Sequence, residues 1–229
     1  MRLFHGSEKV VAEPKFGAGN PFNDYGLGFY CTEHAHMACE WAVRRGIDGF
    51  VNEYELNTDN LRVLDLNGEE FTMMHWLCVL LENRGFSAGT PLARQAKAYI
   101  CETFPVGYED CDAIAGYRAD DSYFSFARAF LGGGISCQQL ARAMHLGKLG
   151  QQVALKSARA FDAIEFCGAK PCLAADWHPK AARRDARARE DFAAMREEAF
   201  DPDGLYMPEI LQKRFGPGSA RLIDAFSGE

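Results

Sequence analysis

The sequence predicts an α+β fold, and three observations support this prediction. Short runs with strand-like alternation occur near both ends of the first 170 residues, whereas the middle of the chain carries apolar residues at helical spacing. The order of these segments differs from the regular strand–helix alternation that builds a parallel sheet. No Gly-x-Gly-x-x-Gly motif follows a predicted strand, so a Rossmann sheet is not expected.

The first third of the chain reads mostly as strands and loops. The expected helix depends on the spacing of Ala35, Ala38, Trp41 and Ala42. The expected elements are strands over residues 2–4, 28–32, 50–56 and 61–66, a Gly-, Asn- and Pro-rich loop over 15–28, and a helix over 33–45.

The middle of the chain is expected to be helical and the end to carry a solvated helix. Ser122 and Ser136 are placed to cap helices that run to residues 131 and 145. The remaining predicted elements are helices over 69–83, 91–104 and 180–200 and strands over 111–115, 152–156 and 163–166. We therefore expect one domain over residues 1–170 with a helical insertion at about 69–104, followed by a helical C-terminal extension over 171–229.

The composition and charge of the chain argue against a nucleic-acid-binding or membrane-spanning protein. The net charge is −7 and the pI about 5.4, which argues against general nucleic-acid binding and favours small molecules or proteins as partners. The longest apolar-rich run, around residues 73–81, is too short to span a membrane. No signal peptide is visible and the eight cysteines lack paired spacing, so we expect reduced thiols and a cytoplasmic protein.

Two segments carry the candidate functional residues. His5-Gly6-Ser7 follows the apolar run that begins the first predicted strand. The second segment contains Gly28 and Tyr30, and the helix after it carries Trp41. A histidine, a glycine that exposes its backbone and two aromatic side chains would then lie near the ends of neighbouring strands. This set of residues is suited to holding a nicotinamide ring and its ribose.

A metal site was considered at Cys31, His34, His36 and Cys39, because cysteine and histidine at such spacing can bind zinc. On a helix, however, two residues that are two positions apart point about 200° away from each other. We therefore expect no metal. We also expect no cysteine nucleophile, because no cysteine occupies a sharp glycine-flanked turn.

The combination of His5-Gly6-Ser7, Gly28-Phe29-Tyr30 and a helix with Ala38 and Trp41 resembles the ADP-ribosyltransferase superfamily, on its His-Tyr-Glu side. The chain is most similar to a bacterial branch catalogued as domain-of-unknown-function family 3990. That likeness covers residues 2–170 and includes the segments at 23–26, 118–121 and 149–153. The resemblance implies a split two-sheet core with a helical insertion and a helical C-terminal segment.

The resemblance also implies that NAD is the substrate and that no metal is needed. His5 would bond an adenosine ribose hydroxyl, and Ser7 would help to seat the carboxamide. The backbone at Gly6 would approach that group closely. Tyr30 and Trp41 would present aromatic faces to the nicotinamide ring, with Gly28 beside them.

The catalytic position departs from the best-known family pattern. Gln152 stands where many members have a glutamate, and an amide can bond a ribose hydroxyl but cannot act as a base. Asp120 and Asp121 are the candidates to supply the missing charge, with Arg118 orienting them or gripping a phosphate of the ligand. The His-Tyr-Glu pattern adds Tyr30 to the catalytic candidates.

The resulting hypothesis is a mono-ADP-ribosyltransferase that cleaves the nicotinamide–ribose bond and transfers ADP-ribose to an unidentified protein or small-molecule acceptor. The alternatives are a non-catalytic NAD or ADP-ribose binding module and an NAD glycohydrolase. Structural roles also stay open for these residues. His5, Tyr30 and Trp41 can be packing residues, Asp120 and Asp121 can begin a helix, and Gln152 can be an ordinary strand residue.

Overall fold

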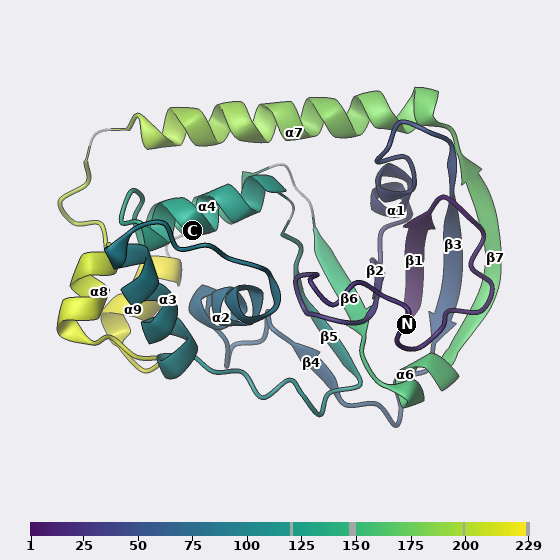
Figure 1. Ribbon diagram of the computed structural model, residues 1–229, viewed down its shortest axis with the longest axis horizontal. Helices are drawn as coiled ribbons and strands as arrows, with labels where there is room; N and C mark the ends of the chain where they lie inside the picture. Colours follow the sequence, from purple (N-terminus) through teal and green to yellow (C-terminus); the bar gives the residue numbers. More distant parts are fainter. Residues whose placement is uncertain (120, 147–149, 199, 228–229) are drawn as a thin grey trace. The chain divides into compact units, whose positions relative to one another are not determined.

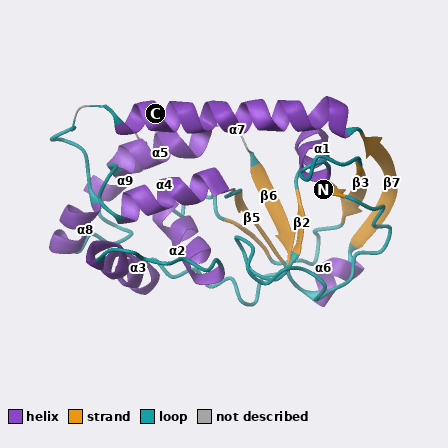
Figure 2. Cartoon of the chain, turned by 45° about the horizontal axis from the view of Figure 1, so that its top comes forward, coloured by secondary structure: helices purple, strands orange, loops and turns teal. Residues whose placement is uncertain are grey.

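The structure is a computed structural model that describes residues 1–119, 121–146, 150–198 and 200–227 (Figure 1). The chain divides into two compact units. The sheet unit comprises residues 1–65, 107–118 and 149–186, and the helical unit comprises residues 66–106, 119–148 and 187–229. No strand occurs in the described residues of the helical unit (Figure 2).

The sheet unit contains two sheets. One has the order β1 (Arg2–Ser7), β3 (Gly49–Leu56), β7 (Ile164–Cys172), with antiparallel neighbours. The other has the order β2 (Phe29–Cys31), β6 (Gln151–Leu155), β5 (Ala113–Tyr117), β4 (Val63–Asp65), in which only β4 and β5 are parallel. A backbone bridge joins β1 to the residue after β2, because the amides of Phe4 and Thr32 each donate to the carbonyl of the other, at 2.7 and 2.9 Å.

Alternation along β1 places successive side chains in two different cores. Leu3 packs into a cluster with Cys31, Leu56 and Leu155. The short helix α6 (Ala158–Asp162) also contributes to this cluster. Phe4 faces the opposite way, into the cluster formed with α1 (Ala35–Ala42). Both faces of β1 are therefore buried over these two residues.

Helix α1 lies directly against the end of β1. A Cβ atom added at Gly6 would come within 1.9 Å of the Ala38 carbonyl oxygen and 2.7 Å of the Ala42 amide nitrogen. Neither backbone atom can move without moving the helix, so only glycine allows this close packing.

The described part of the helical unit is built from helices, and at least two of them begin at a residue whose side chain caps the helix. Thr90 caps the helix that follows it by accepting from the Ala93 amide at 3.1 Å, and Ser136 forms a reciprocal capping box with Gln139. The helices are α2 (Met73–Asn83), α3 (Pro91–Thr103), α4 (Asp121–Leu131), α5 (Cys137–His145), α8 (Met207–Lys213) and α9 (Ala220–Ser227). Helix α7 (Ala174–Arg196) contributes residues to both units.

The α+β prediction is confirmed, and several element boundaries need correction. Strand β7 continues to Cys172, six residues past the predicted end at 166. Helix α7 begins at Ala174 and contains Pro179, whereas the charge-dense stretch predicts a helix only from residue 180. Helix α4 already begins at Asp121, so Ser122 is inside it. The short helices α6, α8 and α9 were not predicted.

The expectation that all cysteines are reduced is wrong for one pair. Cys39 of α1 and Cys172 at the end of β7 form a disulfide, with their Cα atoms 5.5 Å apart. The two cysteines are 133 positions apart in the sequence, so no local spacing could indicate their pairing. The six other cysteines are free.

Among the described helices, none combines the length and the apolar character needed to cross a bilayer.

Candidate functional site

An open pocket of about 770 Å³ lies at the end of β1, within the sheet unit. Three of the predicted binding residues, Gly6, Ser7 and Trp41, line it. The full lining consists of Gly6, Ser7, Glu8, Lys9, Val11, Trp41, Ala42, Arg44 and Arg45. The volume falls in the range of about 300–1,000 Å³ that is usual for small-molecule sites.

The pocket is positively charged although the whole chain is acidic. Lys9, Arg44 and Arg45 contribute three cations, and Glu8 is the single acid in the lining. The Arg45 guanidinium donates to the Glu8 carboxylate at 2.9 Å, which leaves an excess of two positive charges. Such a local excess favours an anionic ligand.

The pocket edge is shaped by Asn52, a buried residue of β3 that the sequence analysis missed. Its amide nitrogen donates to the Ser7 hydroxyl at 2.9 Å and to the His5 carbonyl at 3.2 Å. Its amide oxygen accepts from the Val11 amide at 2.8 Å. Residues 54 and 56, on the same face of β3, are apolar and buried, so a polar side chain at position 52 was the sequence signal for a special role. Asn52 thus fixes the segment that follows β1.

Ser7 already has partners within this segment. Its hydroxyl donates to the Lys9 carbonyl at 2.6 Å while it accepts from Asn52. A hydroxyl oxygen has two lone pairs, so one acceptor position remains for a ligand donor.

Trp41 and Arg118, two predicted binding residues, come together in the sheet unit. The Arg118 guanidinium lies over the Trp41 ring at 4.7 Å from its centroid. The indole N–H of Trp41 is buried and has no hydrogen-bond acceptor in the described part of the chain. One face of the indole is therefore covered by a cation, and its donor lacks an acceptor.

His5 is held in one tautomer by the strand beside it. Its Nδ1 lies 2.7 Å from the Tyr30 carbonyl oxygen. Because a carbonyl only accepts, Nδ1 carries the proton and Nε2 of the neutral ring is an acceptor. Burial lowers the pKa of His5, and the hydrogen bond to Tyr30 opposes this only in part. The ring also contacts Phe29 at 4.4 Å.

The Tyr30 hydroxyl is used within the protein. It donates to the Gly26 carbonyl at 2.7 Å and accepts from the Tyr25 amide at 3.0 Å. The Tyr30 ring stacks on the Tyr25 ring with centroids 6.4 Å apart, and Tyr25 in turn donates to the Tyr117 carbonyl at 2.6 Å. In this structure Tyr30 anchors the loop before β2.

Gln152 has a carboxylate partner that the sequence analysis did not identify. Its Nε2 donates to Asp24 Oδ2 at 2.7 Å and, more weakly, to the Tyr117 carbonyl at 3.4 Å. Both side chains of the pair are buried, each with 4% of its surface exposed. Because Nε2 faces the carboxylate, Oε1 is the atom left to accept from a hydroxyl. Asp24 lies in the polar loop 15–28, where sequence alone cannot separate a buried acid from a solvated one.

The side chains of the predicted acidic pair are not among those that the structure describes. Asp120 lies outside the described residues. Asp121 is the first residue of α4, in the helical unit, and its side chain also lies outside the description.

Gly28 also packs against backbone, although less closely than Gly6. A Cβ atom at Gly28 would approach the Leu155 carbonyl oxygen to 2.9 Å, so the residue lets β6 lie against the segment that enters β2.

Within the candidate zinc set Cys31, His34, His36 and Cys39, the expectation that the two histidines point in opposite directions is wrong. His34 precedes α1 as its N-cap, so the His34 and His36 rings are 5.6 Å apart and do not point in opposite directions. The set is unavailable for a different reason, since Cys39 is bonded to Cys172.

Comparison with known proteins gives a family but no function. No curated protein and no solved structure matches the chain. A family model described as protein of unknown function (DUF3990) matches residues 1–166, which is most of the chain and includes His5, Trp41 and Gln152. The chain belongs to the DUF3990 family.

Proposed function

We propose that this protein is an NAD-dependent mono-ADP-ribosyltransferase whose two sheets form the split core of that superfamily. The observation that carries the proposal is the cationic pocket at the end of β1, lined by Gly6, Ser7 and Trp41. The sequence predicts all three as binding residues, and a single pocket contains them.

The pocket chemistry suits a dinucleotide. Lys9, Arg44 and Arg45 would balance the two negative charges of the diphosphate. Trp41 supplies an aromatic wall, and its buried N–H has no acceptor among the residues that the structure describes, so a polar group of the ligand would provide one. His5 Nε2, the acceptor nitrogen of a neutral ring, suits a ribose hydroxyl.

Catalysis requires stabilisation of a ribosyl cation. The bond between C1′ of the ribose and the nicotinamide nitrogen breaks, and its electron pair leaves with neutral nicotinamide. The acceptor then forms a bond to C1′ and loses its proton. Gln152 Oε1 would accept from the ribose hydroxyl, and the Asp24 carboxylate behind the amide would polarise it toward the developing positive charge.

Gln152 also favours a second candidate, a non-catalytic NAD or ADP-ribose binding module. The amide is neutral and its carboxylate partner is buried, so neither group is placed to take a proton from an acceptor. If water is the only acceptor, the same site would be an NAD glycohydrolase. These outcomes differ in whether nicotinamide is released and in where ADP-ribose goes.

The test is to incubate the pure protein with NAD and to follow free nicotinamide and ADP-ribose by chromatography, with binding measured by calorimetry. A transferase releases nicotinamide and labels an added acceptor, whereas a binding module binds NAD without release. Trp41→Ala should weaken NAD binding by about 5- to 10-fold, in line with the value of one aromatic contact. Trp177→Ala, a partly buried tryptophan outside the pocket lining, is the matched control. Equal affinity in both variants would remove the assignment of the pocket.

A further inference from the structure

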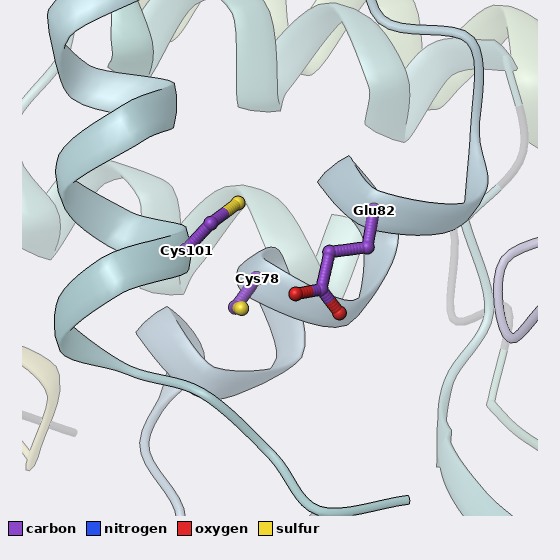
Figure 3. Close-up of side chains that lie close together, drawn as sticks. All are labelled: Cys78, Glu82 and Cys101. Atoms are coloured by element: carbon purple, nitrogen blue, oxygen red, sulfur yellow. The ribbon is translucent and has the colours of Figure 1, made fainter. Parts of the chain in front are cut away.

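Two helices of the helical unit bring together three side chains that neither the pocket nor the proposed reaction uses. Cys78 and Glu82 lie one turn apart on α2, so they share a face of that helix. Cys101 comes from α3. The two sulfur atoms and a carboxylate oxygen all lie within 4.8 Å of one another (Figure 3).

The spacing of these atoms is close to that of a tetrahedral metal site. Two sulfurs that are each about 2.3 Å from a zinc ion are about 3.8 Å apart. Closing the observed cluster around an ion therefore needs movements of about 1 Å or less, which rotation of three side chains can supply. The Cys78 and Cys101 sulfurs lie within 4.8 Å of each other and of a Glu82 carboxylate oxygen, so all three groups already face a shared space.

The donor set selects the metal. Calcium and magnesium prefer all-oxygen sites, and iron–sulfur clusters generally take four cysteines. Two thiolates and one carboxylate suit zinc, which binds both donor types and is usually four-coordinate.

The charges of the cluster also balance with a divalent ion. Two thiolates and the Glu82 carboxylate carry three negative charges, and Lys97, one turn before Cys101 on α3, acts electrostatically on that thiol. A dication together with Lys97 would neutralise all three. The metal would take the place of the protons that the thiols now carry.

Burial changes steadily across the cluster. Cys78 is buried, Cys101 is partly buried and Glu82 is exposed. An ion can therefore enter from the Glu82 side, and water can reach it there. We propose that Cys78, Glu82 and Cys101 bind one zinc ion through three protein ligands, with the fourth position open to water or to an external ligand.

Cobalt is the spectroscopic probe for this site. The whole protein, stripped of metal by a chelator and kept reduced, should bind one Co²⁺ per chain with a thiolate-to-cobalt charge-transfer band in the near ultraviolet. Cys101→Ser should remove about half of that band and weaken zinc affinity about 10-fold or more. Glu82→Gln should weaken zinc affinity but keep the band, because both thiolates remain.

Matched controls separate this cluster from the other thiols and acids. Cys167→Ser changes an exposed free cysteine of the sheet unit, and Glu102→Gln changes an exposed acid next to Cys101. The double variant Cys39→Ser with Cys172→Ser removes the other cysteine pair. All three should bind cobalt and zinc like the wild type.

Three results would overturn the proposal. The first is the absence of a charge-transfer band in the wild type. The second is an equal loss of zinc affinity in Cys101→Ser and Cys167→Ser. The third is a disulfide between Cys78 and Cys101, detected by mass spectrometry, together with no zinc uptake after the protein is reduced. The two thiols would then be a redox pair. Circular dichroism of each variant verifies that it is folded, and Cys101→Ser and Glu82→Gln avoid altering the fully buried Cys78.

Discussion

The sheet unit and the helical unit use buried polar side chains differently. In the described part of the helical unit, the buried polar residues are His75, Ser136 and Gln139, and each takes part in a capping box at the start of α2 or α5. Their burial is explained by the unpaired backbone groups of helix ends. The sheet unit buries the larger set Asp24, Thr32, Asn52, Asp112 and Gln152.

Three of the buried polar residues in the sheet unit, Thr32, Asn52 and Asp112, also bind backbone groups. Thr32 accepts from the His34 amide at 3.3 Å. Asn52 binds one backbone group within β1, at His5, and two after it, and Asp112 accepts from the Arg62 amide at 2.8 Å. The pair of Asp24 and Gln152 is different, because its shortest contact joins two side chains that are 128 positions apart. Burying a carboxylate is costly unless it is well hydrogen-bonded. The comparison therefore singles out this pair as one whose burial secondary structure alone does not explain.

The largest expected effect tests how tightly the sheet unit is packed. Gly6→Ala places a Cβ atom 1.9 Å from the Ala38 carbonyl, so α1 must move away from β1. We expect a loss of about 4 kcal/mol or more in the free energy of unfolding, at the upper end of overpacking effects. Urea denaturation followed by circular dichroism measures it.

The matched variant is Gly85→Ala in the helical unit, where a new Cβ atom would meet nothing within 4 Å. It should change the free energy of unfolding by less than about 1 kcal/mol. If Gly6→Ala changes the free energy of unfolding as little as Gly85→Ala does, α1 does not lie on β1 as described. Ligand binding would then be the main reason for a glycine at position 6.

The second prediction tests the pair of Asp24 and Gln152. Gln152→Glu would place a second carboxylate 2.7 Å from Asp24 Oδ2, where two like charges cannot both remain ionised. We expect lower stability and, if the protein is an enzyme, about 100-fold slower nicotinamide release.

Exchanging the two groups provides the control. In the double variant Asp24→Asn with Gln152→Glu, an amide again donates to a carboxylate, so stability should recover. Nicotinamide release should also recover, because the carboxylate then lies on β6. If the double variant is as unstable as Gln152→Glu alone, repulsion between the two carboxylates is not the cause.

Local sequence patterns were enough to predict most of the helices and strands. Ser136 was predicted to cap a helix ending at residue 145, and α5 has that cap and that end. Helix caps and apolar spacing act within a few residues, so one segment contains the whole signal. Strand β7 was predicted too short because Gly168 and Pro171 interrupt its pattern, although eight of its residues pair with β3.

The candidate site was predictable only in part. Gly6, Ser7 and Trp41 were identified because the motif residues lie at the ends of predicted elements, and all three line the pocket. The Asp24–Gln152 contact and the disulfide between Cys39 and Cys172 span 128 and 133 positions. Such pairings depend on the sheet topology, which no local pattern of the chain specifies.

The smallest expected effect concerns a carboxylate–arginine pair in each unit. In the sheet unit, hydrogen bonds from the Ser157 hydroxyl, the Arg62 amide and Arg159 lower the pKa of the buried Asp112. Its folded pKa is then below the unfolded value of about 3.9, so its contribution to stability is complete above that value and is lost as the pH falls through the folded pKa. Asp112→Asn should cost about 2 kcal/mol at pH 7, and less as the pH falls below about 4.

The helical unit offers the counterpart. Arg142 hydrogen bonds to Glu198 and lowers its pKa, but the two side chains are 52% and 44% exposed, so solvent screens their attraction. Glu198→Gln should therefore change the free energy of unfolding by about 0.5 kcal/mol or less. Amide hydrogen exchange, measured at pH 7 and at pH 3 in β5 and β6 and compared with α5, distinguishes the units. Asp112→Asn should speed exchange in the two strands at pH 7. The difference from the wild type should be smaller at pH 3. The two pairs differ in the burial of their carboxylates. If both substitutions change the free energy of unfolding equally, this burial does not determine how strongly a pair stabilises the protein.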